Sequence, residues 1–169
     1  RSELESVAAA LAGTAVPVAV VGRGSNLLVA DRGFAGLALQ LGDGFEGVDV
    51  AGSVVVAGGA ASLPVVARRT VQAGLSGFEW AVGVPGSIGG AVRMNAGGHG
   101  SDMAAVLGWA DVVDLGGGTT RRIEVGELDL EYRHSVLSPA QVVAAVGLQL
   151  EVDDVGNGEA LLAEVIRWR

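Results

Sequence analysis

Two glycine-rich segments contain the residues of this sequence that are best suited to binding a phosphate group. The first segment, GRGSN at 22–26, is followed by the apolar residues 27–29. Its small residues leave main-chain N–H groups exposed, and the side chains of Ser25 and Asn26 add donors, so the segment can cradle a pyrophosphate. The alternative is an ordinary tight turn between two strands. A Rossmann dinucleotide loop would open a helix after its glycines, whereas we expect residues 27–29 to continue as a strand.

The second segment, GVPGSIGGAV at 83–92, has four glycines in ten residues. Glycines at this density let the backbone approach a flat or anionic ligand closely. Ser87 is a candidate N-cap, and a helix N-terminus beside glycines suits a diphosphate or the electron-rich edge of a flavin. The sequence MNAGGHG at 94–100 extends the segment. The alternative is a helix that crosses another element closely through its glycines, without any ligand.

A third candidate is the sequence YRHS at 132–135, which follows the polar end of a predicted strand. The guanidinium of Arg133 could pair with a carboxylate through two parallel hydrogen bonds, or it could cover the protein surface. Taken alone, the pattern favours the surface role. His99 and His134 are expected to be structural or solvent-facing rather than catalytic.

The composition excludes several kinds of chemistry. All 11 basic residues are arginine, so the chain has neither a Walker-type phosphate lysine nor a Schiff-base lysine. It has no cysteine and only 2 histidines, and we predict no metal site. The net charge of −8 disfavours nonspecific attraction to nucleic acid or to an anionic membrane. The apolar stretch 7–22 is short and contains Gly13 and Pro17, so we expect no membrane span there.

The pattern of apolar residues and turn residues predicts the elements that must position these segments. A helix is expected at 3–12, from the capping-box spacing at Ser2 and the stop at Gly13. The remaining elements expected are strands at 17–21, 27–29, 37–41, 47–50 and 54–57, with a hairpin turn at 51–53, a helix at 62–73, a short helix at 102–107, a hairpin of 110–115 with 119–123, a strand at 141–152 and a helix at 159–169. Strands outnumber helices and do not alternate with them, so the fold class is α+β rather than a doubly wound Rossmann sheet.

Three stretches of the sequence, taken in order, resemble the UDP-N-acetylenolpyruvoylglucosamine reductase family of peptidoglycan synthesis. They are GRGSNLLVADRGFAGL at 22–37, GLSGFEWAVGVPGSIGGAVRMNAGGHG at 74–100 and LEYRHS at 130–135. The resemblance implies a two-lobed α+β FAD-binding domain of the vanillyl-alcohol-oxidase type. It implies that residues 1–169 form this domain, incomplete at the N-terminus and without the substrate-binding domain, so that the chain alone would be inactive.

The resemblance also implies a set of site residues. It assigns noncovalent FAD binding to Arg23, Gly24, Ser25, Asn26, Leu27, Gly83, Val84, Pro85, Gly86, Ser87, Gly89, Gly90 and Asn95. It assigns binding of the UDP-sugar substrate to Tyr132 and Arg133, and it makes Arg133 the catalytic arginine. NADPH would be the co-substrate, and the protein would be a cytoplasmic monomer.

Two other functions are compatible with parts of the pattern. One is an oxidase-type flavoprotein of the same fold with a different substrate domain, although the YRHS sequence argues against it. The other is a β-rich scaffold without enzymatic activity, which would favour regular short repeats that the sequence does not contain.

Overall fold

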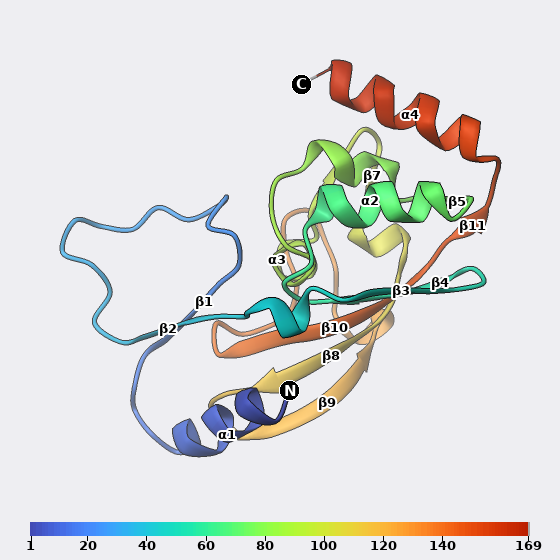
Figure 1. Cartoon of the computed structure of the whole chain (residues 1–169). Helices are drawn as coiled ribbons and strands as arrows, with labels where there is room; N and C mark the ends of the chain where they lie inside the picture. Colours follow the sequence, from blue (N-terminus) through green and yellow to red (C-terminus); the bar gives the residue numbers. More distant parts are fainter. Residues whose placement is uncertain (169) are drawn as a thin grey trace.

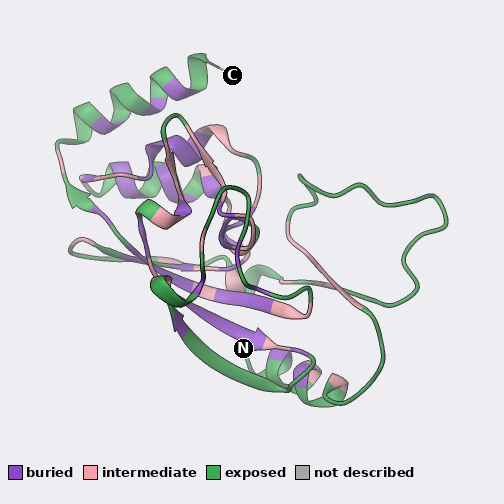
Figure 2. Ribbon diagram, turned by 180° about the vertical axis from the view of Figure 1, so that it is seen from behind, coloured by how far each residue is buried: buried purple, intermediate pink, exposed green. Residues whose placement is uncertain are grey.

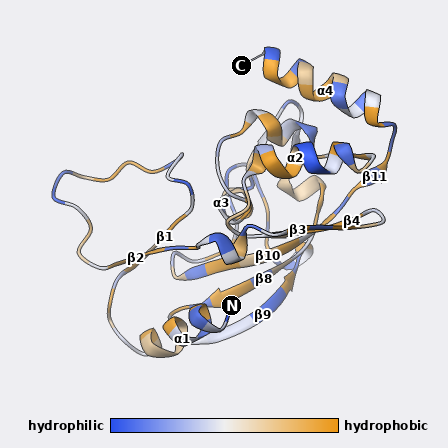
Figure 3. Cartoon of the chain, viewed as in Figure 1, coloured by the Kyte–Doolittle hydropathy of each residue, from blue (hydrophilic) through white to orange (hydrophobic). Residues whose placement is uncertain are grey.

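The centre of the fold is a five-stranded sheet with the strand order β3-β4-β10-β8-β9 (Figure 1). The computed structural model describes residues 1–168. The strands are β3 (Val48–Ala51), β4 (Val54–Gly58), β8 (Leu107–Asp114), β9 (Thr119–Glu124) and β10 (Gln141–Gln149). Every neighbouring pair is antiparallel, which confirms an α+β fold and not a doubly wound parallel sheet. The strands β8 and β10 are mostly hydrophobic, whereas the edge strand β9 is mostly hydrophilic (Figure 3).

Tight turns close the two hairpins of this sheet where the sequence predicts them. Gly52, between β3 and β4, has a φ of +62°, which an L-residue rarely adopts. Between β8 and β9, the Asp114 carboxylate accepts hydrogen bonds from the N–H groups of Gly116 and Gly117, each at 2.9 Å. Local turn chemistry therefore sets the register of both hairpins.

A second, smaller part of the fold is the parallel pair β1 (Val18–Val21) and β2 (Leu37–Gln40). The connection between these strands, residues 22–36, projects from the body of the molecule and is exposed almost throughout (Figure 2). The helix α1 (Ser2–Leu11) packs Leu4 and Ala8 against an apolar cluster on the sheet, against which Val18 and Val20 of β1 also pack. This cluster joins the strand pair to the five-stranded sheet.

Three helices lie on the other side of the sheet (Figure 1). The helix α2 (Leu63–Gln72) begins after Ser62 and buries Leu63, Val66, Ala67, Thr70 and Val71, as its helical spacing predicts. The short helix α3 (Ile88–Arg93) packs on β10, and α4 (Val155–Arg167) packs on α2 and η2 (Glu79–Gly83). The remaining elements are β5 (Leu75–Ser76), β6 (Gly97–Gly98), β7 (Ser101–Asp102), β11 (Glu151–Val152), η1 (Asp43–Phe45), η3 (Met103–Ala105) and η4 (Val125–Glu127).

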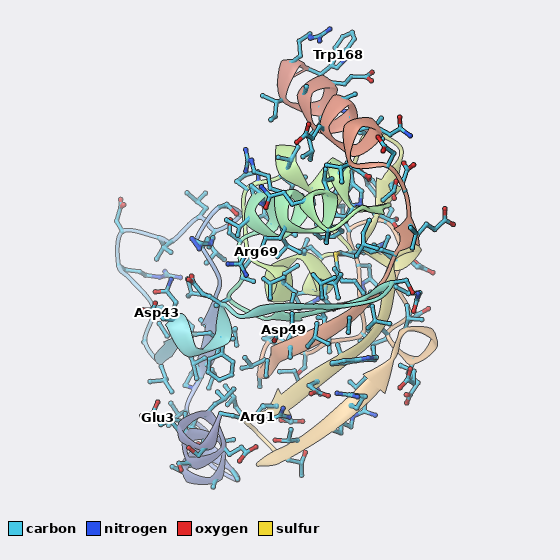
Figure 4. All side chains as sticks on the ribbon, turned by 45° about the vertical axis from the view of Figure 1, so that its right-hand side comes forward. Arg1, Glu3, Asp43, Asp49, Arg69 and Trp168 are labelled. Carbon is cyan, nitrogen blue, oxygen red and sulfur yellow. The ribbon has the colours of Figure 1, made fainter. Side chains whose placement is uncertain are left out.

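Arginine side chains fasten two of the helices to the sheet (Figure 4). The Nη1 atom of Arg69 on α2 donates to the carbonyl oxygen of Val48 on β3 at 3.4 Å. At the start of α1, the Nη1 atom of Arg1 donates to Asp111 Oδ2 at 3.3 Å, and Arg122 Nε donates to the other oxygen of the same carboxylate at 2.8 Å. Asp111 is buried, and its pKa is lowered chiefly by the hydrogen bond from Arg122.

Several expected elements differ from the structure. The predicted strand at 27–29 is absent, because no neighbouring strand pairs with this stretch and its residues extend into solvent, Leu28 with 100% exposure. The predicted capping box at Ser2 is wrong: the N-cap is Arg1, which Asp111 and Glu5 hold in place. The predicted helix at 102–107 is only the 3₁₀ turn η3.

The C-terminal predictions also need adjustment. The predicted strand at 141–152 breaks into β10 and β11, and the last helix starts earlier than expected, at Val155. The cause is Asp154, whose carboxylate accepts from the N–H of Gly156 at 2.8 Å and caps the helix there. Arg169, which we expected in this helix, lies outside the described residues. Within residues 1–168, no helix is long and apolar enough to cross a membrane.

Candidate functional site

Two adjoining cavities form a cleft between the β1–β2 pair and α3. Their volumes are about 400 and 570 Å³, within the range of about 300–1,000 Å³ that is usual for small-molecule sites. Eight residues line both cavities: Val20, Gly22, Arg23, Leu27, Ser87, Gly90, Arg93 and Met94. The first cavity extends along β1 to residues 138–143, and the second extends past residues 24–26 to Arg133. The cleft is therefore an elongated site that suits a long ligand with two different ends.

The two glycine-rich segments meet at this cleft. The hydroxyl of Ser25 donates to the carbonyl oxygen of Pro85 at 3.0 Å. A Cβ on Gly22 would come within 2.6 Å of Ser87 Oγ, so only glycine permits this approach. Gly86 has a φ of +142°, and a Cβ there would lie 3.3 Å from Ser25 Oγ. The two segments thus fit together as one binding surface.

The first segment offers main-chain donors to the cleft. Among residues 1–168, no protein oxygen accepts a hydrogen bond from the N–H groups of residues 24–27. Gly24 has a φ of +73°, and successive N–H groups around such a residue can converge on an anion. Unpaired N–H groups beside a cavity are what a phosphate cradle requires.

The second segment does not offer its helix N-terminus in this way. Ser87 caps α3 as expected, since its hydroxyl accepts from the N–H of Gly90 at 3.3 Å. The N–H groups of Ile88 and Gly89 donate to Ala61 and Gly59 at 2.9 and 2.8 Å. The N–H groups of Ile88 and Gly89 are therefore already paired with the loop that follows β4, and they are not free to bind a diphosphate. Gly89 allows close packing, since its Cβ would lie 3.1 Å from the oxygen of Gly59.

Two arginines line both cavities of the cleft, and they differ in whether a protein carboxylate pairs with them. Arg23 forms a salt bridge with Glu46 at 3.1 Å, and both side chains are about half exposed. Gln40 donates through Nε2 to the oxygen of Gly22 at 3.0 Å and so holds the start of the first segment. Arg93 lines both cavities, and within the described part of the chain it forms no salt bridge.

Arg133 lies at the outer end of the second cavity. It also lines a third hollow of about 360 Å³, together with Tyr132 and residues 97–98 and 100–102. Its guanidinium stands 5.1 Å from the ring centroid of Tyr132 and donates to the oxygen of Gly97 at 3.3 Å. Tyr132 is 87% exposed. The pair thus presents one cation and one aromatic ring at the mouth of the cleft.

Asn95 supports the turn that carries Arg133. It is 3% exposed, and its Nδ2 atom donates to Asp102 Oδ2 at 3.2 Å and to the oxygen of Glu131 at 3.1 Å. Its Oδ1 atom accepts from the N–H of Ala104 at 2.9 Å. Both amide donors of Asn95 are therefore used within the protein, and the side chain positions the neighbouring turn. Asn95 lines the third hollow and neither of the larger cavities.

The structure brings most of the predicted site residues together. The second cavity is lined by ten of those assigned to FAD, which are Arg23, Gly24, Ser25, Asn26, Leu27, Val84, Pro85, Gly86, Ser87 and Gly90. Gly89 lines the first cavity, and Gly83 lines none of the three, because it packs against Val165 of α4. The sequence interpretation missed Gln40 and Arg93. Arg93 could have been found, since it is the only arginine of the block 74–100. No group of acidic residues and histidines that could hold a metal ion occurs within residues 1–168.

The fold and the cleft define this chain as a flavin-binding domain of the α+β type. A sequence model of the FAD binding domain family matches residues 1–124. The solved structure of UDP-N-acetylenolpyruvylglucosamine reductase from Thermus caldophilus is 34% identical, with a TM-score of 0.86 over 99% of this chain and 59% of that one. Glucooligosaccharide oxidase from Acremonium strictum, 19% identical with a TM-score of 0.58 over 87% of this chain and 33% of that one, shares the fold.

The chain belongs to the FAD binding domain family, and it is similar to UDP-N-acetylenolpyruvoylglucosamine reductases. The enzyme of that name from Heliobacterium modesticaldum is 45% identical over 155 residues, which cover 91% of this chain and 49% of the relative. The chain spans about half the length of the curated relatives that it matches.

Proposed function

We propose that this chain is the FAD-binding part of an enzyme that reduces UDP-N-acetylenolpyruvoylglucosamine to UDP-N-acetylmuramate in peptidoglycan synthesis. The observation that carries the proposal is the elongated cleft, which has unpaired N–H groups at residues 24–27 and the cation of Arg133 at its mouth. The reductases of the same family support it. NADPH would be the reductant, and the whole protein would be a cytoplasmic monomer.

The cleft fits FAD in shape and in chemistry. The N–H groups of residues 24–27 would hold its phosphates, and the hydroxyl of Ser25, which donates to Pro85, would keep these groups in place. Gly86 and Gly90 keep the wall of the second cavity free of side chains, so a flat ring system can lie against it. Binding would be noncovalent, as the resemblance to the reductases implies. When bound, FAD would supply hydride transfer from NADPH to the substrate.

Arg133 would act on the substrate. Hydride addition to the enolpyruvyl double bond places negative charge next to the substrate carboxylate. A guanidinium remains charged at neutral pH and meets a carboxylate with two parallel donors, so it would both orient the substrate and stabilise the developing charge. The turn anchored by Asn95 would keep this guanidinium at the mouth of the cleft, and Tyr132 would cover the substrate beside it.

Anaerobic stopped-flow spectroscopy of the full-length protein tests this function. Oxidised flavin should absorb at roughly 450 nm, lose that band with NADPH and regain it when the UDP-enolpyruvyl sugar is added. A protein that binds no flavin would contradict the proposal. Reduced flavin that is reoxidised by oxygen but not by the UDP-sugar would indicate an oxidase of the same fold instead.

A further inference from the structure

Arg93 is a cation at the centre of the cleft. It is the last residue of α3 and lines both larger cavities. Its side chain is half-buried, and none of the salt bridges within residues 1–168 includes it. A guanidinium that faces a cavity without a protein carboxylate is available to an anionic ligand.

The other cations of the cleft are differently placed. Arg23 also lines both cavities, but Glu46 neutralises it at 3.1 Å. Of the two larger cavities, Arg133 lines only the second, at the end away from the first. The second cavity has no acidic residue in its lining, and Glu46 is the acidic residue of the first. Arg93 is therefore the cation without a carboxylate partner where the two cavities meet.

The main chain of Arg93 is fixed from behind. The hydroxyl of Ser135, which is buried, donates to the carbonyl oxygen of Arg93 at 2.8 Å. This bond ties the end of α3 to the segment that carries Arg133. The segment that forms the mouth of the cleft therefore also holds the backbone from which the Arg93 side chain extends.

We infer that Arg93 is a cofactor-binding residue whose guanidinium neutralises the diphosphate of FAD. The inference rests on the proposed function. FAD carries its diphosphate between two larger ends, so a molecule that occupies both cavities has its charged centre at their common wall. The chain has a net charge of −8 and no lysine, so a dianion needs a local cation there. Arginine suits the task, since its planar fork binds phosphate oxygens in pairs.

Equilibrium titration of the full-length apoprotein with FAD and with riboflavin, which lacks phosphate, tests the inference. Arg93→Gln should weaken FAD binding by about 10- to 100-fold, the usual effect of losing a charge-assisted hydrogen bond, and should change riboflavin binding by less than about 2-fold. Arg93→Lys should recover part of the FAD affinity. Raising the salt concentration should weaken FAD binding to the wild type more than to Arg93→Gln.

Arg68→Gln is the matched control, because it removes the same charge from an exposed position on α2 outside the cleft. It should leave both affinities unchanged, and thermal unfolding without ligand should be the same for all variants. Equal losses for FAD and riboflavin, or an unaltered FAD affinity in Arg93→Gln, would overturn the role of Arg93 while leaving the proposed function intact. A wild type that binds neither flavin would overturn both.

Discussion

The hydroxyl of Ser25 donates a hydrogen bond to the carbonyl oxygen of Pro85 at 3.0 Å, across 60 positions of sequence. Ser25 belongs to the connection 22–36, which otherwise extends into solvent (Figure 2). Pro85 belongs to the second glycine-rich segment, which is anchored on the sheet through α3. This hydrogen bond therefore fixes the position of the unpaired N–H groups of residues 24–27 relative to the opposite wall of the cleft.

Ser25→Ala should weaken FAD binding by about tenfold, since it removes the hydrogen bond that fixes the loop relative to Pro85. The exposed bond should matter little for the fold, so the free energy of unfolding without ligand should change by less than about 0.5 kcal/mol. Titration calorimetry and urea unfolding measure the two quantities. Ser6→Ala, which removes a hydroxyl from the exposed side of α1, is the control and should leave the FAD affinity unchanged. An unchanged FAD affinity in Ser25→Ala would show that the loop is positioned by other contacts.

Gly86→Ala should reduce both stability and FAD affinity. The φ of +142° disfavours any residue with a Cβ and costs about 1–3 kcal/mol, and the added methyl would press on Ser25 Oγ at 3.3 Å. Gly126→Ala provides a control, because a Cβ there meets nothing within 4 Å and its φ is not positive. Urea unfolding and FAD titration of both variants would check the difference. Equal effects of the two substitutions would mean that Gly86 has no special place in the cleft.

Arg133→Ala should slow reoxidation of the reduced flavin by the UDP-sugar by about 10²–10³-fold, the usual effect of removing one electrostatic donor. Reduction of the flavin by NADPH should change much less, because no charge develops on the enolpyruvyl group in that step. Arg133→Lys should recover only part of the rate, since an ammonium keeps the charge but lacks the planar fork. Stopped-flow absorbance follows both half-reactions. If both slow equally, Arg133 supports the fold rather than the substrate.

Asp111→Asn should destabilise the fold in a pH-dependent way. The hydrogen bond from Arg122 lowers the pKa of Asp111, so the folded state favours the ionised carboxylate. This stabilisation is present above the ordinary aspartate pKa of about 4 and is lost as the pH falls through the lowered pKa. The variant should be less stable than the wild type by about 1 kcal/mol at pH 7, and the gap should close below about pH 4.

Urea unfolding between pH 2 and 7 would measure this gap, at about four to six pH values that span the ordinary aspartate pKa. Asp31→Asn, in the exposed connection 22–36, forms no salt bridge within the described residues and should change stability by less than about 0.5 kcal/mol at any pH. A gap for Asp111→Asn that is constant over the whole range would show that shape rather than charge matters at this position.

The sequence alone determined the features that depend on neighbouring residues. The helical spacing of residues 63–71 specifies α2, and the turn residues at 51–53 and 116–118 specify the two hairpins. These two inferences rest on local conformational preference. The glycine-rich segments and the YRHS sequence each have a purely structural interpretation when taken alone, and they indicated a flavin site only through their joint resemblance to one reductase family.

Tertiary structure alone decided which polar groups remain available to a ligand. The N–H groups at the start of α3 suit a phosphate in sequence, but the carbonyl oxygens of Gly59 and Ala61 occupy them. The apolar residues 27–29 have the composition of a strand, but no strand lies beside them; Leu27 lines the cleft, and Leu28 and Val29 are exposed to solvent. Arg23 and Arg93 both line the two larger cavities, but only Arg23 has a carboxylate, that of Glu46, within reach in the described part of the chain. Hydrogen-bond and charge pairing over long sequence distances depends on how the chain packs, and no local pattern records it.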